Sequence, residues 1–195
     1  MIAIRHACQA LVLVVLASTA ALAKEPPKPA TVKFNLDGLE YVHRTSMRGR
    51  NDFTPASQAD MNSWRDRVTI VTRENVTSDD QLSGIAGNLY ETVTDLGEIV
   101  RTNSAANPKT QATEHFFAAK LQGKGFTQAS FARLGLAEGK GMVVVYSHRS
   151  YGEHSDETST AWMDRNGEAT ESALMSWTGM PKLAQLRTLP QTTSK

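Results

Sequence analysis

The chain has 195 residues, of which 21 are lysine or arginine and 20 are aspartate or glutamate, so its formal net charge is only +1. This balance argues against a protein that binds nucleic acid or an anionic membrane through charge alone. The single cysteine is Cys8. The chain beyond it therefore has no disulfide framework, no cysteine-ligated zinc and no cysteine nucleophile.

The first 23 residues have the three parts of a secretory signal peptide. Arg5 supplies the positive charge, residues 11–16 are purely apolar, and Ala21-Leu22-Ala23 is the small-x-small pattern that signal peptidase recognises. The apolar stretch spans about a dozen residues, whereas a membrane-spanning helix needs roughly 20. We therefore predict cleavage after Ala23 and export to the periplasm or the medium, without a stable membrane anchor. An uncleaved N-terminal anchor is the alternative.

A proline-rich linker, residues 24–31, follows the predicted cleavage site. Beyond it, residues 32–35 and 39–44 contain short runs typical of strands. Asp37-Gly38 lies between them, and this dipeptide favours the positive φ angles of a tight hairpin turn. The start of the folded domain is therefore predicted to be a β-hairpin.

A short helix, a strand and a long helix are expected next. Thr54-Pro55 is typical of a helix N-cap followed by proline at the first helical position, which predicts a short helix through about residue 62. Residues 68–72 favour a strand. Ser78, followed by two aspartates and then a glutamine, has the pattern of a capping box. Apolar residues then recur at helical spacing until Gly97, which predicts an amphipathic helix.

Three strands follow in close order, at residues 115–121, 129–136 and 142–147. Short glycine-containing turns join them, and such links force neighbouring strands to run antiparallel. The run from Met142 to Tyr146 shows no alternation of polar and apolar residues. We therefore expect it to be a central strand that is covered on both faces of the sheet.

A second long helix, weakened at Asn166-Gly167, is predicted over residues 156–177. We expect residues 181–195 to form a flexible C-terminal tail. The predicted fold is α+β: a mostly antiparallel sheet covered by two long helices, in a single domain of residues 32–180.

This order of elements resembles the layout of the PsbP-like and DcrB-like α/β/α sandwiches. The likeness covers most of residues 32–178 and depends on the order of helices and strands. Those families include noncatalytic lumenal and periplasmic proteins of diverse roles. The resemblance therefore implies a sandwich fold, and it leaves the function to be argued from the residues themselves.

The densest polar cluster of the chain extends from Ser147 to Asp156, directly after the predicted central strand. Within it, His148, Arg149 and Tyr151 are the candidate ligand-binding residues. Arginine forms bidentate contacts with carboxylate or phosphate, and tyrosine adds a stacking face. We therefore predict that these residues bind an anionic or peptidic ligand at the end of the strand. An ordinary polar loop is the alternative.

A metal site or a hydrolase active site is the competing hypothesis for the same stretch. His148 and His154, with nearby carboxylates, offer nitrogen and oxygen ligands suited to zinc or another divalent ion. Their spacing matches no established metal motif, and neither Ser147 nor Ser150 lies in a G-x-S-x-G or S-x-x-K pattern. The sequence therefore assigns no metal ligand and no catalytic residue.

The leading hypothesis is an exported, noncatalytic binding or accessory protein of the bacterial cell envelope. Its partner would be a protein or a small ligand, and the sequence indicates neither a cofactor nor nucleic-acid binding. A small exported metal-dependent hydrolase that uses the region of His148 and His154 is the alternative.

Overall fold

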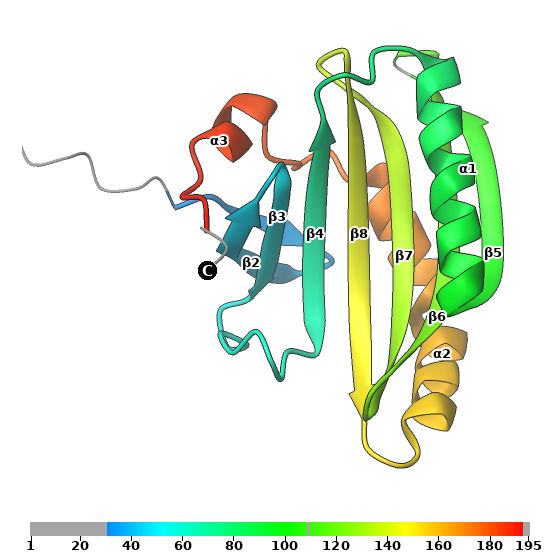
Figure 1. Ribbon diagram of the computed structural model, residues 1–195. Coiled ribbons are helices and arrows are strands. Elements are labelled where there is room, and N and C mark those ends of the chain that lie inside the picture. The colour runs from blue at the N-terminus through cyan, green and yellow to red at the C-terminus, as the bar shows by residue number, and fades with distance from the viewer. Residues whose placement is uncertain (1–30, 109, 193–195) are drawn as a thin grey trace, which may run out of the picture.

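The computed structural model describes residues 31–108 and 110–192 (Figure 1). The predicted signal peptide and residues 24–30 of the predicted linker lie outside the described residues, so cleavage after Ala23 stays a prediction. In the described part of the chain, no helix is long and apolar enough to cross a membrane.

The fold is built on one sheet of eight strands in the order β1-β2-β3-β4-β8-β7-β6-β5. The strands are β1 (Lys33–Leu36), β2 (Leu39–Met47), β3 (Arg50–Pro55), β4 (Asp66–Arg73), β5 (Gly97–Ala106), β6 (Thr113–Gly123), β7 (Phe126–Ala137) and β8 (Lys140–Tyr151). Each strand runs antiparallel to its neighbours. Two long helices accompany the sheet, α1 (Asp79–Leu96) and α2 (Ser155–Ser176). The predicted α+β fold is confirmed.

The predicted central strand is β8, which lies between β4 and β7. Val143 belongs to the hydrophobic cluster on the α1 face of the sheet, and its neighbour Val144 belongs to the cluster on the α2 face. Both side chains are buried. The structure therefore confirms that this apolar run is covered on both faces.

The predicted hairpin at Asp37-Gly38 is also confirmed. Asp37 has a φ of 49° and Gly38 a φ of 75°, and β1 and β2 pair antiparallel on either side of them. Tight hairpin turns of this kind need positive φ at both central residues, and Gly supplies it without steric strain.

The helix predicted after Thr54-Pro55 is absent, and both residues belong to β3. Thr54 pairs with Val42 of β2 and is completely buried. Its hydroxyl donates to the carbonyl of Gln58 at 2.5 Å instead of capping a helix. The local cap pattern was misleading because strand pairing with β2 satisfies this backbone better than a short helix would.

The edge strand β5 was not anticipated from the sequence. Nearly all of its residues are exposed, so it lacks the alternation of apolar and polar side chains that marks a half-buried strand. Its partner is β6, against which Thr102 pairs with Phe117. Pairing along β6, and not its own composition, defines this element.

Helix α1 begins where the capping pattern predicted. The Ser78 hydroxyl accepts a hydrogen bond from the backbone nitrogen of Gln81 at 3.3 Å, and Asp79 and Asp80 lie in the first turn. The Gln81 side chain accepts from the backbone nitrogen of Thr77 at 2.8 Å. The helix packs mainly on β5, β6 and β7, at one side of the sheet (Figure 1).

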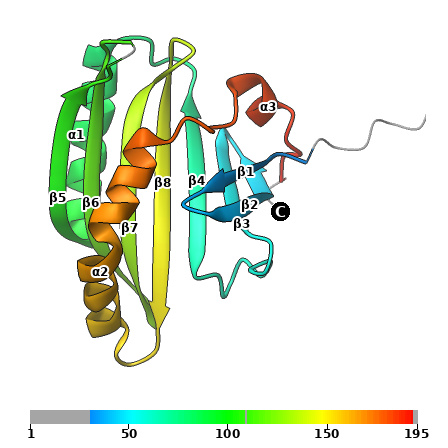
Figure 2. The ribbon, with the colours of Figure 1, turned by 180° about the vertical axis from the view of Figure 1, so that it is seen from behind.

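Helix α2 covers the opposite face of the sheet (Figure 2). It continues through Asn166-Gly167 without a break. A Cβ atom on Gly167 would lie 3.8 Å from the ring of Phe131, so the glycine lies where the helix packs on the sheet. Packing on β7 and β8 stabilises a helix that this dipeptide alone would weaken.

The segment after Pro181, for which we expected a flexible tail, forms the short helix α3 (Leu183–Arg187). Leu183, Leu186 and Leu189 are buried in the hydrophobic core of the α2 face. Arg187 also forms an ion pair with Glu74 at 2.7 Å. This leucine spacing places all three side chains on the sheet, and their burial orders the segment.

Candidate functional site

The three predicted ligand-binding residues lie on β8, which extends to Tyr151, and not on a loop. Successive side chains of a strand point to opposite faces of the sheet. His148 accordingly contacts Trp162 of α2, whereas Arg149 and Tyr151 contact Trp64 on the other face. The structure therefore does not bring the three side chains into one site.

His148 lies in a tight set of contacts. Its ring is stacked on Trp162 with the ring centres 4.2 Å apart and the planes at 7°. Its Nδ1 atom lies 2.8 Å from Asp66 Oδ1, and the Tyr146 hydroxyl donates to the same oxygen at 2.8 Å. Burial opposes the charged form of Asp66, but hydrogen bonds from His148, Gln58 and Tyr146 outweigh it and lower the pKa of Asp66.

Arg149 is held between two aromatic rings. Its guanidinium carbon lies 4.0 Å from the centre of the Trp64 ring and 3.8 Å from that of Phe126. Arg149 Nε donates to Gln128 Oε1 at 3.0 Å, and the Tyr151 hydroxyl donates to the Trp64 carbonyl at 2.7 Å. Both predicted residues are therefore engaged within the fold, through cation–π and hydrogen-bond contacts.

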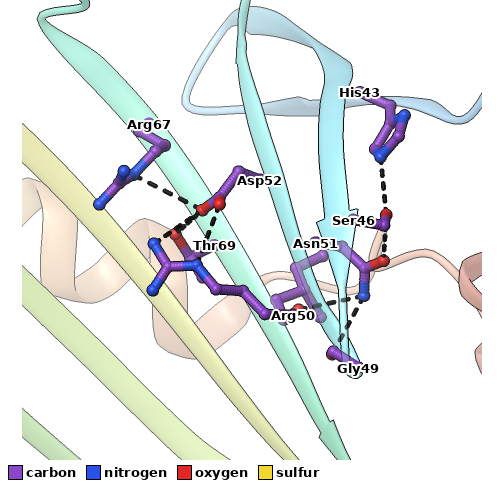
Figure 3. A network of polar contacts seen from close by, with 9 residues as sticks. His43, Ser46, Gly49, Arg50, Asn51, Asp52, Arg67 and Thr69 are labelled. Atoms are coloured by element: carbon purple, nitrogen blue, oxygen red, sulfur yellow. Dashed lines mark hydrogen bonds and ion pairs between the residues drawn. The ribbon is translucent and has the colours of Figure 1, made fainter. Parts of the chain in front are cut away.

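The other candidate residue, His154, lies at the start of α2 and pairs with Glu157 at 2.9 Å, with both side chains 78% exposed. His43 contacts Ser46 at 2.7 Å in a different part of the sheet (Figure 3). Within residues 31–108 and 110–192, no three His, Cys, Asp or Glu side chains gather closely enough to hold a metal ion. His148 and His154 each have one carboxylate partner.

A groove of about 560 Å³, which we call the α1 groove, lies between α1 and the strands beside it. Its volume falls in the range of about 300–1,000 Å³ that is common for small-molecule sites. Helix α1 packs mainly on β5, β6 and β7. It therefore leaves β4 and β8 uncovered on this face of the sheet, and these two strands form the floor of the groove. Ile85 and Leu89 of α1 form one wall, and Arg50 of β3 lies on the opposite side.

The floor of the α1 groove changes from polar to apolar along the strands. At one end, the strand register places Arg67 beside Ser147 and Ser147 beside Ser130. Farther along, it places Val71 beside Val143. A strand rises about 3.3 Å per residue, so the four residues from Ser147 to Val143 separate the two rows by about 13 Å. The groove therefore has a polar end at Arg67 and an apolar body around Val71 and Val143, beyond which Arg73 also lines it.

Arg50 and Thr69, which line the groove, hold the buried carboxylate of Asp52 (Figure 3). Arg50 donates from Nε and Nη2 to the two Asp52 oxygens at 3.0 and 3.1 Å, and Thr69 Oγ1 donates at 2.6 Å. Burial raises the energy of the charged carboxylate, but these hydrogen bonds and the charges of Arg50 and Arg67 hold the pKa of Asp52 below its usual value.

Arg67 has a charge but no hydrogen-bond acceptor among the described residues. Its Nε atom is buried without a partner and lies 3.7 Å from Asp52 Oδ1, which is too long for a hydrogen bond. The guanidinium carbon lies 4.1 Å from the centre of the Trp64 ring. Burial lowers the pKa of Arg67 to about 10, so the side chain remains charged at neutral pH.

The two serines beside Arg67 also have unused donors. Gln128 Nε2 donates to Ser130 Oγ at 2.8 Å and to Ser147 Oγ at 3.2 Å. Each serine oxygen thus accepts a hydrogen bond, while its own hydroxyl hydrogen has no acceptor in the described part of the chain. The side chains of Gln128, Ser130 and Ser147 are all buried. The polar end of the α1 groove therefore presents donors to whatever enters it.

Part of this site was visible in the sequence. Arg67 and Thr69 in β4, and Gln128 and Ser130 in β7, recur at every second position, which places each pair on one face of its strand. Sequence reasoning missed the site because β4 pairs with β8, and the paired residues Ile70 and Val144 are 74 positions apart in the chain. The pattern of either strand alone does not indicate this pairing. The missing signal was the pairing partner of β4.

The sequence matches no protein-family model, and no curated protein matches it. Similar solved structures include PA94, a Pseudomonas aeruginosa protein of unknown function, with 10% identity and a TM-score of 0.45 over 78% of this chain and 99% of that chain. The Ran-binding protein Mog1p of Saccharomyces cerevisiae has 11% identity and a TM-score of 0.40 over 76% of this chain and 90% of that chain. Neither likeness bears on what the groove binds.

Proposed function

We propose that this chain is an exported, noncatalytic binding protein of the bacterial cell envelope that holds a small amphiphilic ligand in the α1 groove. The leader-like sequence of residues 1–23 supports export. The similarity of its element order to the PsbP-like and DcrB-like sandwiches agrees with a noncatalytic role. The position of the ligand follows from the groove itself.

One observation carries the proposal: a concave site combines an apolar body with buried donors that have no partner. Small-molecule sites are mostly apolar and contain a few polar groups that fix orientation. Arg67, Ser130 and Ser147 supply such groups at one end, and Val71 and Val143 begin the apolar part. Leaving buried donors unsatisfied typically costs about 1–3 kcal/mol each, so a ligand that accepts their hydrogen bonds would stabilise the fold.

To test this proposal, a bulky side chain is introduced on α1 so that it fills the groove. Thr92 lines the groove and Thr94 does not, while both are exposed helical residues whose hydroxyls donate to the carbonyl four residues earlier. Thr92→Trp and its matched control Thr94→Trp are compared with wild type for binding of the uncharged fluorescent probe N-phenyl-1-naphthylamine.

We expect Thr92→Trp to lose most of the probe binding and Thr94→Trp to keep it, because only the first side chain points into the α1 groove. Equal binding by the two variants would place the probe elsewhere. Wild-type protein that does not bind the probe at all would contradict the proposal.

A hydrolase is the second candidate, and the pairing of His148 with Asp66 at 2.8 Å favours it. A carboxylate on one imidazole nitrogen orients the other as a general base. Among the described residues, no side chain is hydrogen-bonded to His148 Nε2 as a nucleophile would be. Zinc titration and an esterase assay with p-nitrophenyl acetate test this candidate, and activity or zinc binding that disappears in His148→Gln would support it.

A further inference from the structure

We infer that the natural ligand of the α1 groove is a long-chain carboxylate, with its head group at Arg67, Ser130 and Ser147 and its hydrocarbon chain along the apolar body. This inference rests on the proposed function and names the class of ligand. The donors, the charge and the register of the groove floor each support it.

Among the described residues, the polar end has three donor groups without an acceptor, while each of its side-chain oxygens already accepts one hydrogen bond. Gln128 Oε1 already accepts from Arg149, and the oxygens of Ser130 and Ser147 already accept from Gln128. What remains is the guanidinium of Arg67 and two hydroxyl hydrogens. A neutral alcohol or amide would bring donors of its own to this end, whereas an ionised carboxylate only accepts. This excess of free donors therefore favours a head group that only accepts hydrogen bonds.

The charge of this end is positive. Arg67 is 3.7 Å from Asp52, but both oxygens of that carboxylate are occupied by hydrogen bonds from Arg50, and one of them also by Thr69. Asp52 therefore leaves the hydrogen-bonding capacity of Arg67 unused. No acidic residue is among the described residues that line the groove, and Arg67 is the cation at this end. Arg50 is paired with Asp52, and Arg73 lies at the opposite end of the groove, beyond the row of Val71 and Val143. An anion is favoured at the Arg67 end, and charge-assisted hydrogen bonds are the strong ones.

A carboxylate balances the charge of this end better than a phosphate does. Arg50 and Asp52 pair with each other, so the charge of Arg67 remains to be balanced. A carboxylate carries one negative charge, whereas a phosphate carries about −1.5 to −2. The three donors come from three adjacent strands, β4, β8 and β7, which are spaced by about 4.8 Å. Two carboxylate oxygens can accept all three hydrogen bonds, since each has two lone pairs.

The direction of the strands indicates where the hydrocarbon chain of the ligand would lie. From the row of Arg67 and Ser147, the floor passes Val145 and reaches the row of Val71 and Val143. Ile85 and Leu89 of α1 face the same space. The ligand thus lies along β4 and β8 with its head at the end of the groove where β8 finishes.

Displacement of N-phenyl-1-naphthylamine measures the preference for the head group. Dodecanoate is compared with methyl dodecanoate, which has the same chain without charge, and with dodecyl phosphate. We expect dodecanoate to bind at least about tenfold more tightly than the methyl ester, as an ion-assisted pair predicts. Arg67→Gln should abolish most of this preference, while Arg165→Gln, an exposed residue of α2, should retain it.

Ser147→Ala serves as a second variant, because it removes one donor without changing a charge. It should weaken dodecanoate binding several-fold and methyl dodecanoate binding less, because a hydrogen bond to a charged carboxylate is stronger than one to an ester carbonyl. If the ester binds as tightly as the acid, and Thr92→Trp blocks both, the groove binds ligands but the carboxylate assignment is wrong. Tighter binding of dodecyl phosphate would also overturn that assignment. If the probe does not bind to wild type, the proposed function itself fails.

Discussion

The imidazole of His148 lies parallel to the indole of Trp162, with the ring centres 4.2 Å apart. Stacking of this kind, together with the hydrogen bond to Asp66, connects β8 to α2 on one side and to β4 on the other. A residue that was a candidate for ligand binding is thus a contact between three elements of the fold.

His148→Ala should therefore lower the free energy of unfolding by about 1–3 kcal/mol, because it removes the stack and leaves Asp66 without one of its donors. Urea denaturation of both proteins measures the change. His154→Ala is the control, since that side chain is 78% exposed and surface substitutions usually change stability by less than about 0.5 kcal/mol. Equal effects of the two substitutions would contradict the stacking contribution.

Acidification should destabilise the protein through Asp52. Its pKa in the fold is lowered, so its interactions stabilise the folded state fully above the unfolded value of about 3.9. That contribution is lost as the pH falls through the lowered pKa. The free energy of unfolding of Asp52→Asn should therefore change less between pH 6 and pH 3 than that of wild type. Urea titrations across this range test it, and parallel curves for the two proteins would refute it.

Gly84→Ala should stabilise α1 by about 0.5–1 kcal/mol, because alanine has the higher helix propensity. A Cβ atom at this position would meet nothing within 4 Å. Gly49→Ala is the opposite case, since Gly49 has a φ of 80° and its Cβ would lie 3.1 Å from the Thr72 carbonyl oxygen. Thermal melts should move up for the first variant and down for the second. A downward shift for Gly84→Ala would mean that α1 needs its flexibility or close packing there.

Export of the full chain should remove residues 1–23, as the pattern Ala21-Leu22-Ala23 predicts. Intact-mass measurement on protein recovered from the periplasm of a Gram-negative host decides this. The expected species begins at Lys24. A mass that includes Arg5 and the apolar stretch after it would contradict the prediction and favour an anchored protein.

The elements that were predicted correctly are those whose own residues determine the local structure. Ser78 provides a hydroxyl at the right place for a helix cap, and Asp37-Gly38 can adopt positive φ. The missed elements depend on distant partners. Thr54 has a cap-like context but pairs with Val42, and Leu186 lies in a polar segment but is buried against the core. The local preference for a secondary structure is overridden wherever strand pairing or burial stabilises a different structure by more.

For the candidate site, too, the sequence indicated local residue types but not the contacts between distant segments. Arg149 and Tyr151 were predicted to bind a ligand, but in the structure both contact Trp64, which lies in a different segment of the chain. Alternation along β8 would have separated His148 from Arg149 if the strand had been extended to Tyr151. The α1 groove required the pairing of Arg67 with Ser147, which follows from the topology and not from either strand alone.

That pairing has a kinetic consequence. The chain is synthesised from its N-terminus, so β1 to β4 are complete before β8 has been synthesised. During this time Thr69 of β4 lacks its pairing partner, Val145 of β8. Until then, one edge of β4 has unpaired backbone groups that can join another chain. Contacts so distant in sequence also slow folding. The nascent protein is therefore most vulnerable to aggregation between the completion of β4 and the arrival of β8, the interval in which a chaperone would protect it most.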